Sequence, residues 1–195
     1  MSKKLELQAI EDTARAYLLN AGLSAKIIKG LEDVGYFTAP ASMRHHLNTP
    51  GGLASHSIHV TNIALAFSVF NDRTSIYRFG MLHDLVKCFC YRKAKTGKGY
   101  SYIQPPYPGH GVCSALVASD MGIHLTEEER CAIVWHMGAF GLDDNALKEY
   151  RAALDRFPRS LILSHAADHL ASALESHNDT FTITSAGRAR IEKGE

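Results

Sequence analysis

The chain of 195 residues lacks the features that mark a membrane-spanning, secreted or strongly charged protein. Its longest apolar stretch, around Ile63–Phe70, is far too short to cross a bilayer. The first residues lead into a polar segment and not into the apolar core of a signal peptide, so we expect a cytoplasmic protein with no membrane partner. The formal net charge is only +1, which leaves no global electrostatic basis for binding nucleic acid.

Cysteine is scarce as well, and the four cysteines lack the spacing of a disulfide framework or of a CxxC pair set. Cys88 and Cys90 could touch a metal, but their neighbours Leu85, Val86 and Phe89 are apolar and indicate core. A free cysteine in such surroundings behaves as a small hydrophobe. We therefore expect buried free thiols at Cys88, Cys90, Cys113 and Cys131.

The composition that is present suits one globular domain, because 46% of the residues are hydrophobic and 21% are charged. Histidine is the outlier, with eleven residues. Histidine is the commonest metal ligand and the side chain that most readily exchanges a proton near neutral pH. Composition alone does not separate these uses, so the positions of the histidines must decide.

Apolar residues recur at helical spacing along most of the chain, which predicts an all-α fold. The segment between residues 92 and 109 holds several prolines and glycines and is expected to be a long loop or a short hairpin. The residues from 178 on are polar, and we expect them to be partly disordered. The expected helices cover residues 4–19, 24–34, 53–70, 74–91, 110–121, 126–136 and 160–177, with a short one after residue 144.

This pattern predicts three parts within a single compact helical bundle. An N-terminal helical segment covers residues 1–40 and packs on the core. The main helical domain covers residues 41–178, and a polar C-terminal tail covers residues 179–195. The oligomeric state is left open by the sequence.

Six polar residues stand out because they lie on, or at the start of, five separate expected helices and have apolar or small neighbours. Such groups are costly on a core-facing stripe unless they are paired or bind a metal. A helix bundle can direct all of them to one interior point. These residues are His56, the pair His83 and Asp84, His110, His136 and Asp168.

Four imidazoles and two carboxylates suit divalent iron, manganese, zinc, cobalt or nickel better than calcium or magnesium. A carboxylate such as Asp84 can bridge two ions, which together activate a water and clamp the oxygens of a substrate. The sequence therefore predicts one or two divalent transition-metal ions in the core of the bundle.

Several short motifs around these residues resemble the HD-domain superfamily of metal-dependent phosphohydrolases. The run His83-Asp84-Leu-Val-Lys87 is similar to the HDxxK segment of the family, and Asp168 in Ala-Ala-Asp-His-Leu-Ala-Ser is similar to its closing aspartate. His110 in Gly-His-Gly and His136 in Val-Trp-His-Met-Gly resemble the two extra histidines of dinuclear members. The resemblance covers roughly residues 43–176.

One departure and one further likeness qualify this resemblance. The family usually has a small residue where this chain has Val86-Lys87, a difference that concerns packing and not the ligands. The run from His45 and His46 through Pro-Gly-Gly-Leu to His56-Ser is similar to a segment found in some branches, one of them of exoribonucleases.

The resemblance implies a role for each of the main residues. A first metal would be held by His56, His83, Asp84 and Asp168, and a second by the addition of His110 and His136. Asp84 and Lys87 would be the catalytic side chains, with Lys87 stabilising phosphate charge. The nucleophile would be a water whose pKa the metal lowers.

Other candidates border this site. His46 and, from the loop after the HD segment, Arg92 and Tyr107 are candidate substrate-binding residues, because basic and aromatic side chains together bind phosphate and stack a base. Each has the alternative of being a solvated loop residue. His59, one turn after His56, is expected to support the ligands or to pack, and His165 to reach the margin of the site.

The resemblance implies a phosphomonoesterase or phosphodiesterase that acts on a nucleotide or a related small phosphate. A first alternative is a di-iron oxygenase of a small polyol or phosphonate, since some HD-fold members with the same ligands catalyse such oxidations. A second is an exonuclease or a nucleic-acid-binding protein. A third is a ligand-sensing HD domain without catalysis, against which the complete ligand set argues.

Overall fold

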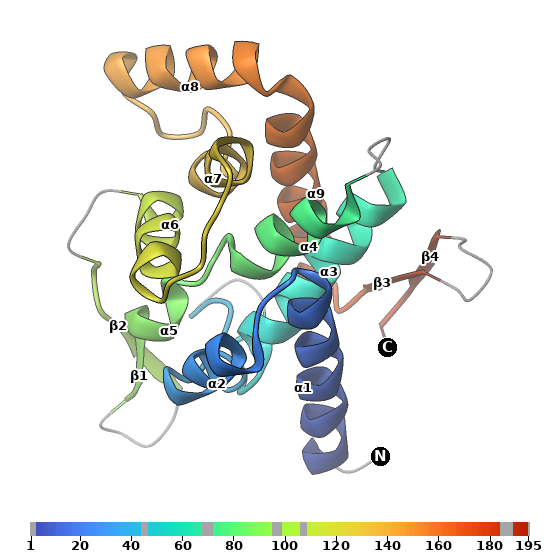
Figure 1. Ribbon diagram of the computed structural model, residues 1–195. Helices are drawn as coiled ribbons and strands as arrows, with labels where there is room; N and C mark the ends of the chain where they lie inside the picture. Colours follow the sequence, from blue (N-terminus) through green and yellow to red (C-terminus); the bar gives the residue numbers. More distant parts are fainter. Residues whose placement is uncertain are drawn as a thin grey trace.

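The computed structural model describes residues 3–43, 47–67, 72–94, 99–105, 109–183 and 189–194. This part of the chain is mostly helical, as the sequence predicts, with two small hairpins (Figure 1). The helices are α1 (Lys3–Asn20), α2 (Ala25–Asp33), α3 (Gly52–Phe67), α4 (Arg73–Leu82), α5 (Lys87–Cys90), α6 (His110–Asp120), α7 (Glu127–Val134), α8 (Asp144–Arg156) and α9 (Pro158–Ser176). The strands are β1 (Tyr91–Lys93), β2 (Tyr100–Tyr102), β3 (Thr180–Ile183) and β4 (Ala189–Glu192), paired antiparallel as β1–β2 and β3–β4.

Local sequence signals begin several of these helices. Ser24 caps α2 and Asp72 caps α4, each by accepting a hydrogen bond from a backbone N–H of the first turn. Thr126 and Glu129 form a reciprocal capping box at the start of α7. Three glutamates occupy the first turn of α7, where the helix dipole favours negative charge.

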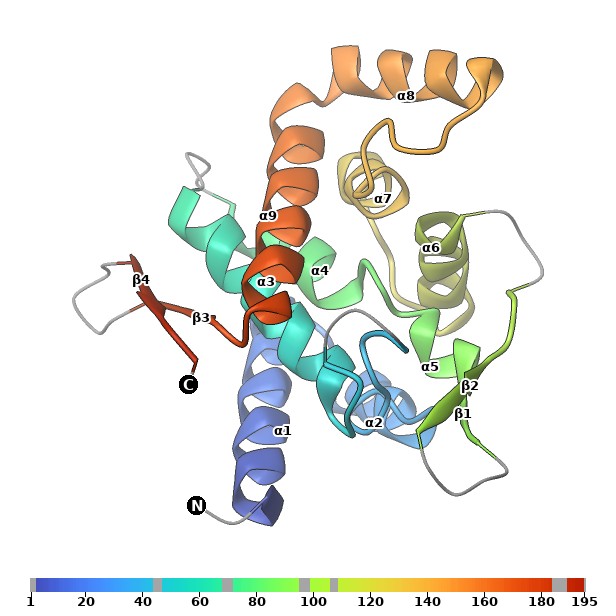
Figure 2. The same cartoon turned by 180° about the vertical axis from the view of Figure 1, so that it is seen from behind.

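Helix α3 is the centre of the bundle. It contacts α1, α4, α9 and β3, and residues on several of its sides are buried, including Leu53, Val60 and Ile63. A helix that is apolar around much of its surface is stable only when neighbours cover it. The two hairpins lie on opposite sides of the bundle, and α8 extends from one end of α9 (Figures 1 and 2).

The structure departs from the expected helix over residues 74–91. Helix α4 ends at Leu82, and a turn carries the chain through His83 and Asp84 to the short helix α5. The apolar periodicity continues through this turn because Leu85 and Val86 are buried there. The apolar periodicity therefore predicts correctly which residues are buried, but it does not predict that the helix ends at Leu82.

Two of the segments outside the expected helices form hairpins. The segment after α5 forms the hairpin β1–β2, one of the two alternatives, in which Tyr91 lies opposite Tyr102. Within the polar tail, β3–β4 form a hairpin that is anchored by Phe181, which is buried against the bundle. Helix α8 is also longer than the short helix expected after residue 144.

The four cysteines are free, as expected, but only Cys90 and Cys113 are fully buried, while Cys88 and Cys131 are half-buried. Among the helices in the described parts of the chain, none combines the length and the apolar character that crossing a bilayer requires.

Candidate metal centre

Five segments bring the six candidate ligands to one place in the interior. His56 comes from the middle of α3, His83 and Asp84 follow α4, and Asp168 lies on α9. His110 is the first residue of α6, and His136 lies just beyond α7. All are buried except His110, whose side chain is 33% exposed. The expectation that these residues share an interior point is confirmed by their distances.

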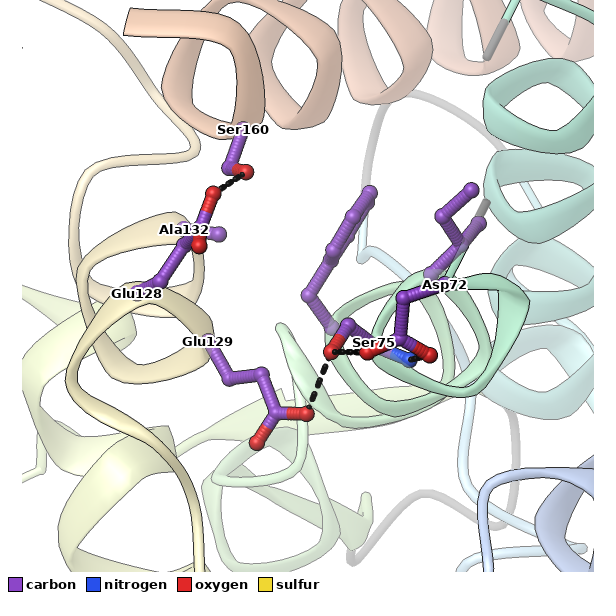
Figure 3. A pocket seen from close by; sticks show the side chains of 8 residues that line it. Asp72, Ser75, Glu128, Glu129, Ala132 and Ser160 are labelled. Atoms are coloured by element: carbon purple, nitrogen blue, oxygen red, sulfur yellow. Dashed lines mark hydrogen bonds between the residues drawn. The ribbon is translucent and has the colours of Figure 1, made fainter. Parts of the chain in front are cut away.

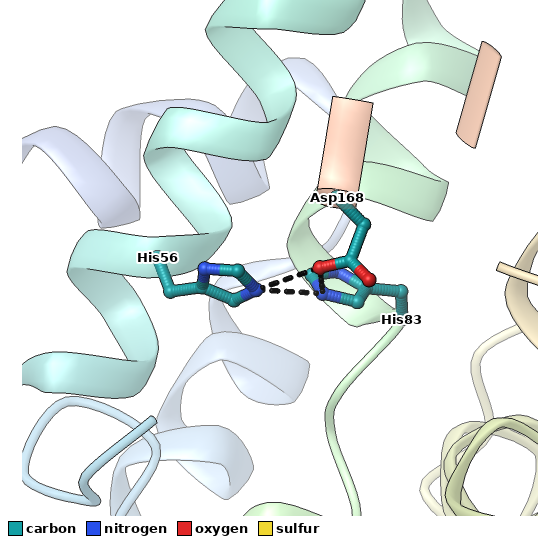
Figure 4. A group of neighbouring side chains, drawn as sticks. All are labelled: His56, His83 and Asp168. Carbon is teal, nitrogen blue, oxygen red and sulfur yellow. Dashed lines mark hydrogen bonds and ion pairs between the residues drawn. The ribbon is translucent and has the colours of Figure 1, made fainter. Parts of the chain in front are cut away.

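The first group of ligand atoms surrounds the Nε2 atom of His56. This atom lies 3.0 Å from Oδ1 of Asp168 and 3.3 Å from Nε2 of His83. Figure 4 shows the two rings and the carboxylate pointing toward one another from three different elements. Oδ2 of Asp84 is 3.3 Å from Nε2 of His83. His56, His83 and Asp168 together form a group that can hold a metal ion.

The second group lies on the other side of Asp84. The Nε2 atoms of His110 and His136 are 2.9 Å apart, and Oδ1 of Asp84 lies 3.5 Å from the first and 3.9 Å from the second. His83, Asp84 and His136 form a further group that can hold a metal ion. The carboxylate of Asp84 thus turns one oxygen to each pair of histidines.

Asp84 provides the test of whether a cation fits this centre. Its side chain is almost fully buried, and its Oδ1 atom accepts no hydrogen bond from any residue that the structure describes. Its Oδ2 atom pairs with Nζ of Lys87 at 2.5 Å. A buried carboxylate oxygen without a donor is costly, and a metal ion removes that cost. The donor set and this unsatisfied oxygen both fit a divalent metal.

Backbone contacts fix the orientation of two histidine rings. Nδ1 of His83 donates to the carbonyl oxygen of Gly80 at 2.9 Å, and Nδ1 of His136 donates to that of Ile133 at 2.7 Å. A carbonyl only accepts, so each Nδ1 carries the proton and each Nε2 keeps its lone pair. Both lone pairs therefore face the centre in the tautomer that metal ligation requires.

A buried glutamate that the sequence analysis missed orients the third ring. Glu175 accepts from Nδ1 of His56 at 2.9 Å and from Nδ1 of His59 at 2.8 Å. Glu175 lies two turns after Asp168 on α9, and this spacing places it on the same face of the helix as the aspartate. His59 supports the site through this carboxylate, in keeping with the role expected for it.

The electrostatics favour ligand-competent protonation at most of these groups. Burial lowers the pKa of His136 to about 4, with a further contribution from His83, and burial also lowers the pKa of His110. Burial opposes ionisation of Asp84, but Lys87 and the histidines outweigh it and hold the pKa of its carboxyl well below the usual range. Neutral imidazoles and ionised carboxylates are the forms that bind metals.

His56 differs from the other histidines. Burial lowers its pKa, but Glu175 and Asp168 outweigh burial and raise the pKa to about 10. Nε2 of His56 therefore carries a proton, and a metal ion would have to displace it. Metal binding at this position would release that proton.

Two glycines allow the helices that carry the ligands to approach closely. A Cβ atom at Gly80 would lie 2.4 Å from Oγ1 and 3.0 Å from Cα of Thr61. The absence of a side chain at Gly80 therefore allows α4 to approach α3 closely. A Cβ atom at Gly111 would lie 2.5 Å from the carbonyl oxygen of Val134, which joins α6 to the end of α7. The first contact lies one turn from both His56 and His83, and the second lies next to His110 and His136. Glycine is therefore required at position 80 for the approach of His56 to His83, and at position 111 for the approach of His110 to His136.

A cavity of about 300 Å³ gives access to the centre. Its walls include Lys87 and the two tyrosines that face each other across β1–β2, Tyr91 and Tyr102, whose ring centroids are 5.8 Å apart. Arg92 is exposed on β1 and is not among the residues that line this cavity. His45, His46 and Tyr107 lie outside the described residues.

A second, partly buried polar cluster lies apart from this centre, between α4, α7 and α9 (Figure 3). Glu129 accepts hydrogen bonds from Ser75 at 2.7 Å and from Arg78 at 3.3 Å, and Glu128 accepts one from Ser160. The cluster encloses only about 70 Å³. We call these residues, together with Asp72, the acidic joint, because their hydrogen bonds connect the three helices.

Comparisons of the chain with protein-family models, curated proteins and solved structures find no match.

Proposed function

We propose that this chain is a metal-dependent phosphohydrolase with an HD-type helical domain, which acts on a phosphate ester of a nucleotide or a related small molecule. The proposal rests on the likeness of its motifs to the HD-domain superfamily and on the residues that the fold brings together. The metals considered are one or two divalent ions of iron, manganese, zinc, cobalt or nickel.

The observation that carries the proposal is the position of Asp84 between two histidine pairs. One oxygen is 3.3 Å from Nε2 of His83, and the other is 3.5 Å from Nε2 of His110. A carboxylate placed in this way suits the bridging ligand of a two-metal site. Metal ions bound there would supply an activated water for attack on phosphorus and positive charge beside the phosphoryl oxygens.

Lys87 favours phosphate over an uncharged substrate. Its side chain is 17% exposed and lines the cavity next to Asp84, so its ammonium can contact a phosphoryl oxygen. Among the described residues of the cavity wall, Lys87 is the only lysine or arginine. One such cation suits a single phosphate group better than the extended backbone of a nucleic acid, which argues against the exonuclease alternative.

The deciding experiment is phosphate release from a panel of phosphomonoesters and phosphodiesters. The protein is first stripped with a chelator and then reloaded separately with each of the five metals. We expect release with at least one metal and none after chelation. Release that survives chelation, or silence with every metal, would contradict the proposal, and oxygen consumption by the iron-loaded protein would favour the oxygenase alternative.

A lysine variant tests the role of the cavity. Replacing the ammonium, Lys87→Gln, should lower kcat by about 100-fold, in the range seen when one stabilising donor is removed. The matched control is Lys93→Gln, because Lys93 is exposed on the adjacent strand β1 and does not line the cavity of the centre. Equal activities of the two variants would remove Lys87 from the proposal.

A further inference from the structure

A larger cleft adjoins the metal centre. It has a volume of about 680 Å³ and is formed by the loop after α7 and one face of α9. Met137, Asp168 and Ser172 line both this cleft and the cavity of the centre, so the two spaces meet at the ligand Asp168. Cavities of this size hold small organic molecules.

The walls of the cleft are aromatic, apolar or weakly polar. Phe140 is 82% exposed and Met137 is 39% exposed, although both line a concave space. Such exposed apolar surface marks a place where another molecule binds. Among the described residues of this wall there is no lysine or arginine, and Asp168 is the only acid. The wall therefore offers an aromatic surface for stacking, the rings of His165 and His169 and two serine hydroxyls, and no lysine or arginine for a second phosphate group.

Specific contacts build the loop side of the cleft. Nδ1 of His165 donates to the carbonyl oxygen of the ligand His136 at 2.9 Å. A Cβ atom at Gly138 would lie 2.9 Å from Cε1 of the His165 ring, and the φ of this residue, +64°, also suits glycine. The loop that carries Met137 and Phe140 is thus fixed to α9 and to the metal centre.

We propose that this cleft binds the organic group of a phosphomonoester, a flat uncharged ring system such as the base of a nucleoside monophosphate, with Phe140 as a stacking residue. This inference rests on the proposed function, because it assigns the phosphate group to Asp84 and Lys87 in the adjoining cavity. Phe140 then determines specificity and takes no part in the reaction. Nucleoside monophosphates are preferred over diphosphates and triphosphates, whose added charge finds no lysine or arginine on the described wall.

The test compares kcat/KM for a nucleoside 5′-monophosphate and for glycerol 3-phosphate, which lacks a ring. Phe140→Ala should lower kcat/KM for the nucleotide by about tenfold, the usual effect of removing one aromatic stacking partner, and leave glycerol 3-phosphate unchanged. The matched control is Phe67→Ala, since Phe67 is 62% exposed at the end of α3, away from the cleft. An equal loss on both substrates, or no loss on either, overturns the inference.

A binding measurement separates this inference from the proposed function. Saturation-transfer NMR with the free nucleoside, which carries no phosphate, reports the cleft whether or not the protein hydrolyses anything. We expect binding by the wild-type protein and by Phe67→Ala, and weaker binding by Phe140→Ala. If no phosphoester is hydrolysed but this pattern holds, only the proposed function fails. If hydrolysis occurs but the nucleoside binds all three proteins equally or not at all, only the cleft assignment fails.

Discussion

The metal centre and the acidic joint both contain buried carboxylates, yet their hydrogen bonding differs. In the acidic joint, Glu129 accepts from Ser75, from Arg78 and, at 2.8 Å, from the backbone N–H of Thr126. In the metal centre, Oδ1 of Asp84 accepts no hydrogen bond from a described residue. Burial of an acid therefore does not by itself indicate a candidate metal site in this protein, whereas the oxygen of Asp84 without a donor fits a cation.

The neighbours of the carboxylates differ in the same sense. In the acidic joint, donors face acceptors, as where Ser75 lies between Asp72 and Glu129. In the metal centre, the Nε2 atoms of His110 and His136 lie 2.9 Å apart, beside Oδ1 of Asp84. The hydrogen bonds of the joint connect three helices, while the centre gathers ligand atoms that can hold a metal ion.

The substitution Asp84→Asn tests the difference between the metal centre and the acidic joint most directly. The amide keeps the shape of the side chain but removes the negative charge that both groups of ligands share. We expect loss of all bound metal and a fall in activity of more than about 100-fold, beyond the range for residues that only support a ligand. Metal content by mass spectrometry and phosphate release measure these effects.

The control is the same exchange at the other cluster, Glu129→Gln, which should retain wild-type metal content. Circular dichroism of both variants distinguishes lost metal from lost fold. If Asp84→Asn binds as much metal as the wild type, Asp84 is not the shared ligand and the contrast between the two clusters disappears.

A truncation in the acidic joint should affect stability alone. Glu129→Ala removes the partner of Arg78 and half of the capping box of α7. The free energy of unfolding should fall by about 3 kcal/mol, the low end for breaking a buried ion pair. Urea unfolding at saturating metal measures this loss, and the metal affinity should not change.

The matched control for this change lies on the surface of the same helix. Glu127 pairs with Arg156 and both side chains are more than half exposed, so Glu127→Ala should cost less than about 1 kcal/mol. A weaker metal affinity in Glu129→Ala would mean that the acidic joint is coupled to the centre and is not merely structural.

The hydrogen bond between Glu175 and Nδ1 of His56 allows a test within the metal centre of how a supporting carboxylate affects metal affinity. Glu175→Gln removes a charged acceptor from Nδ1 of His56 and keeps the size of the side chain. Metal affinity should fall by about 10- to 100-fold, the usual effect of losing such a supporting partner. Titration with a competing chelator gives the affinity.

The control is His59→Gln, which alters the other contact of Glu175 and leaves His56 with its acceptor. It should weaken metal binding less than Glu175→Gln does. Equal losses would mean that both residues act on packing in general, and that Glu175 has no particular effect on His56.

Glu175 also illustrates what the sequence could not reveal. The six candidate ligands could be picked out because each is a metal-binding residue type placed among apolar neighbours, and the structure brings all six together. Glu175 lies near a helix end next to Ser176 and His177, where a charged residue is usually solvated. Its partners His56 and His59 are far away in the sequence, so only the packing of α3 on α9 identifies it.

The fold was predictable to a similar degree and for similar reasons. Apolar periodicity indicates which residues are buried, and this was correct for most helices. It does not indicate where a buried segment leaves the helix, as at His83, or that a single residue such as Phe181 anchors a hairpin. Both features depend on tertiary contacts that override local propensity.

The smallest expected effect lies at the solvated edge of the acidic joint, where Asp72 caps α4. Asp72→Ala removes the acceptor for the N–H groups of Thr74 and Ser75 and should cost about 1 kcal/mol at neutral pH. The hydrogen bond from Ser75 is the largest cause of the lowered pKa of this carboxyl. The ionised form of Asp72 therefore stabilises the fold above the usual pKa of 3.8, and this contribution is lost as the pH falls through the lowered pKa. Urea unfolding should show that the difference in stability between Asp72→Ala and the wild type shrinks below about pH 4.

The control is Asp72→Asn, which keeps the cap but does not titrate. Its stability should stay close to that of the wild type at neutral pH. A difference that does not change with pH would show that the cap does not depend on its charge.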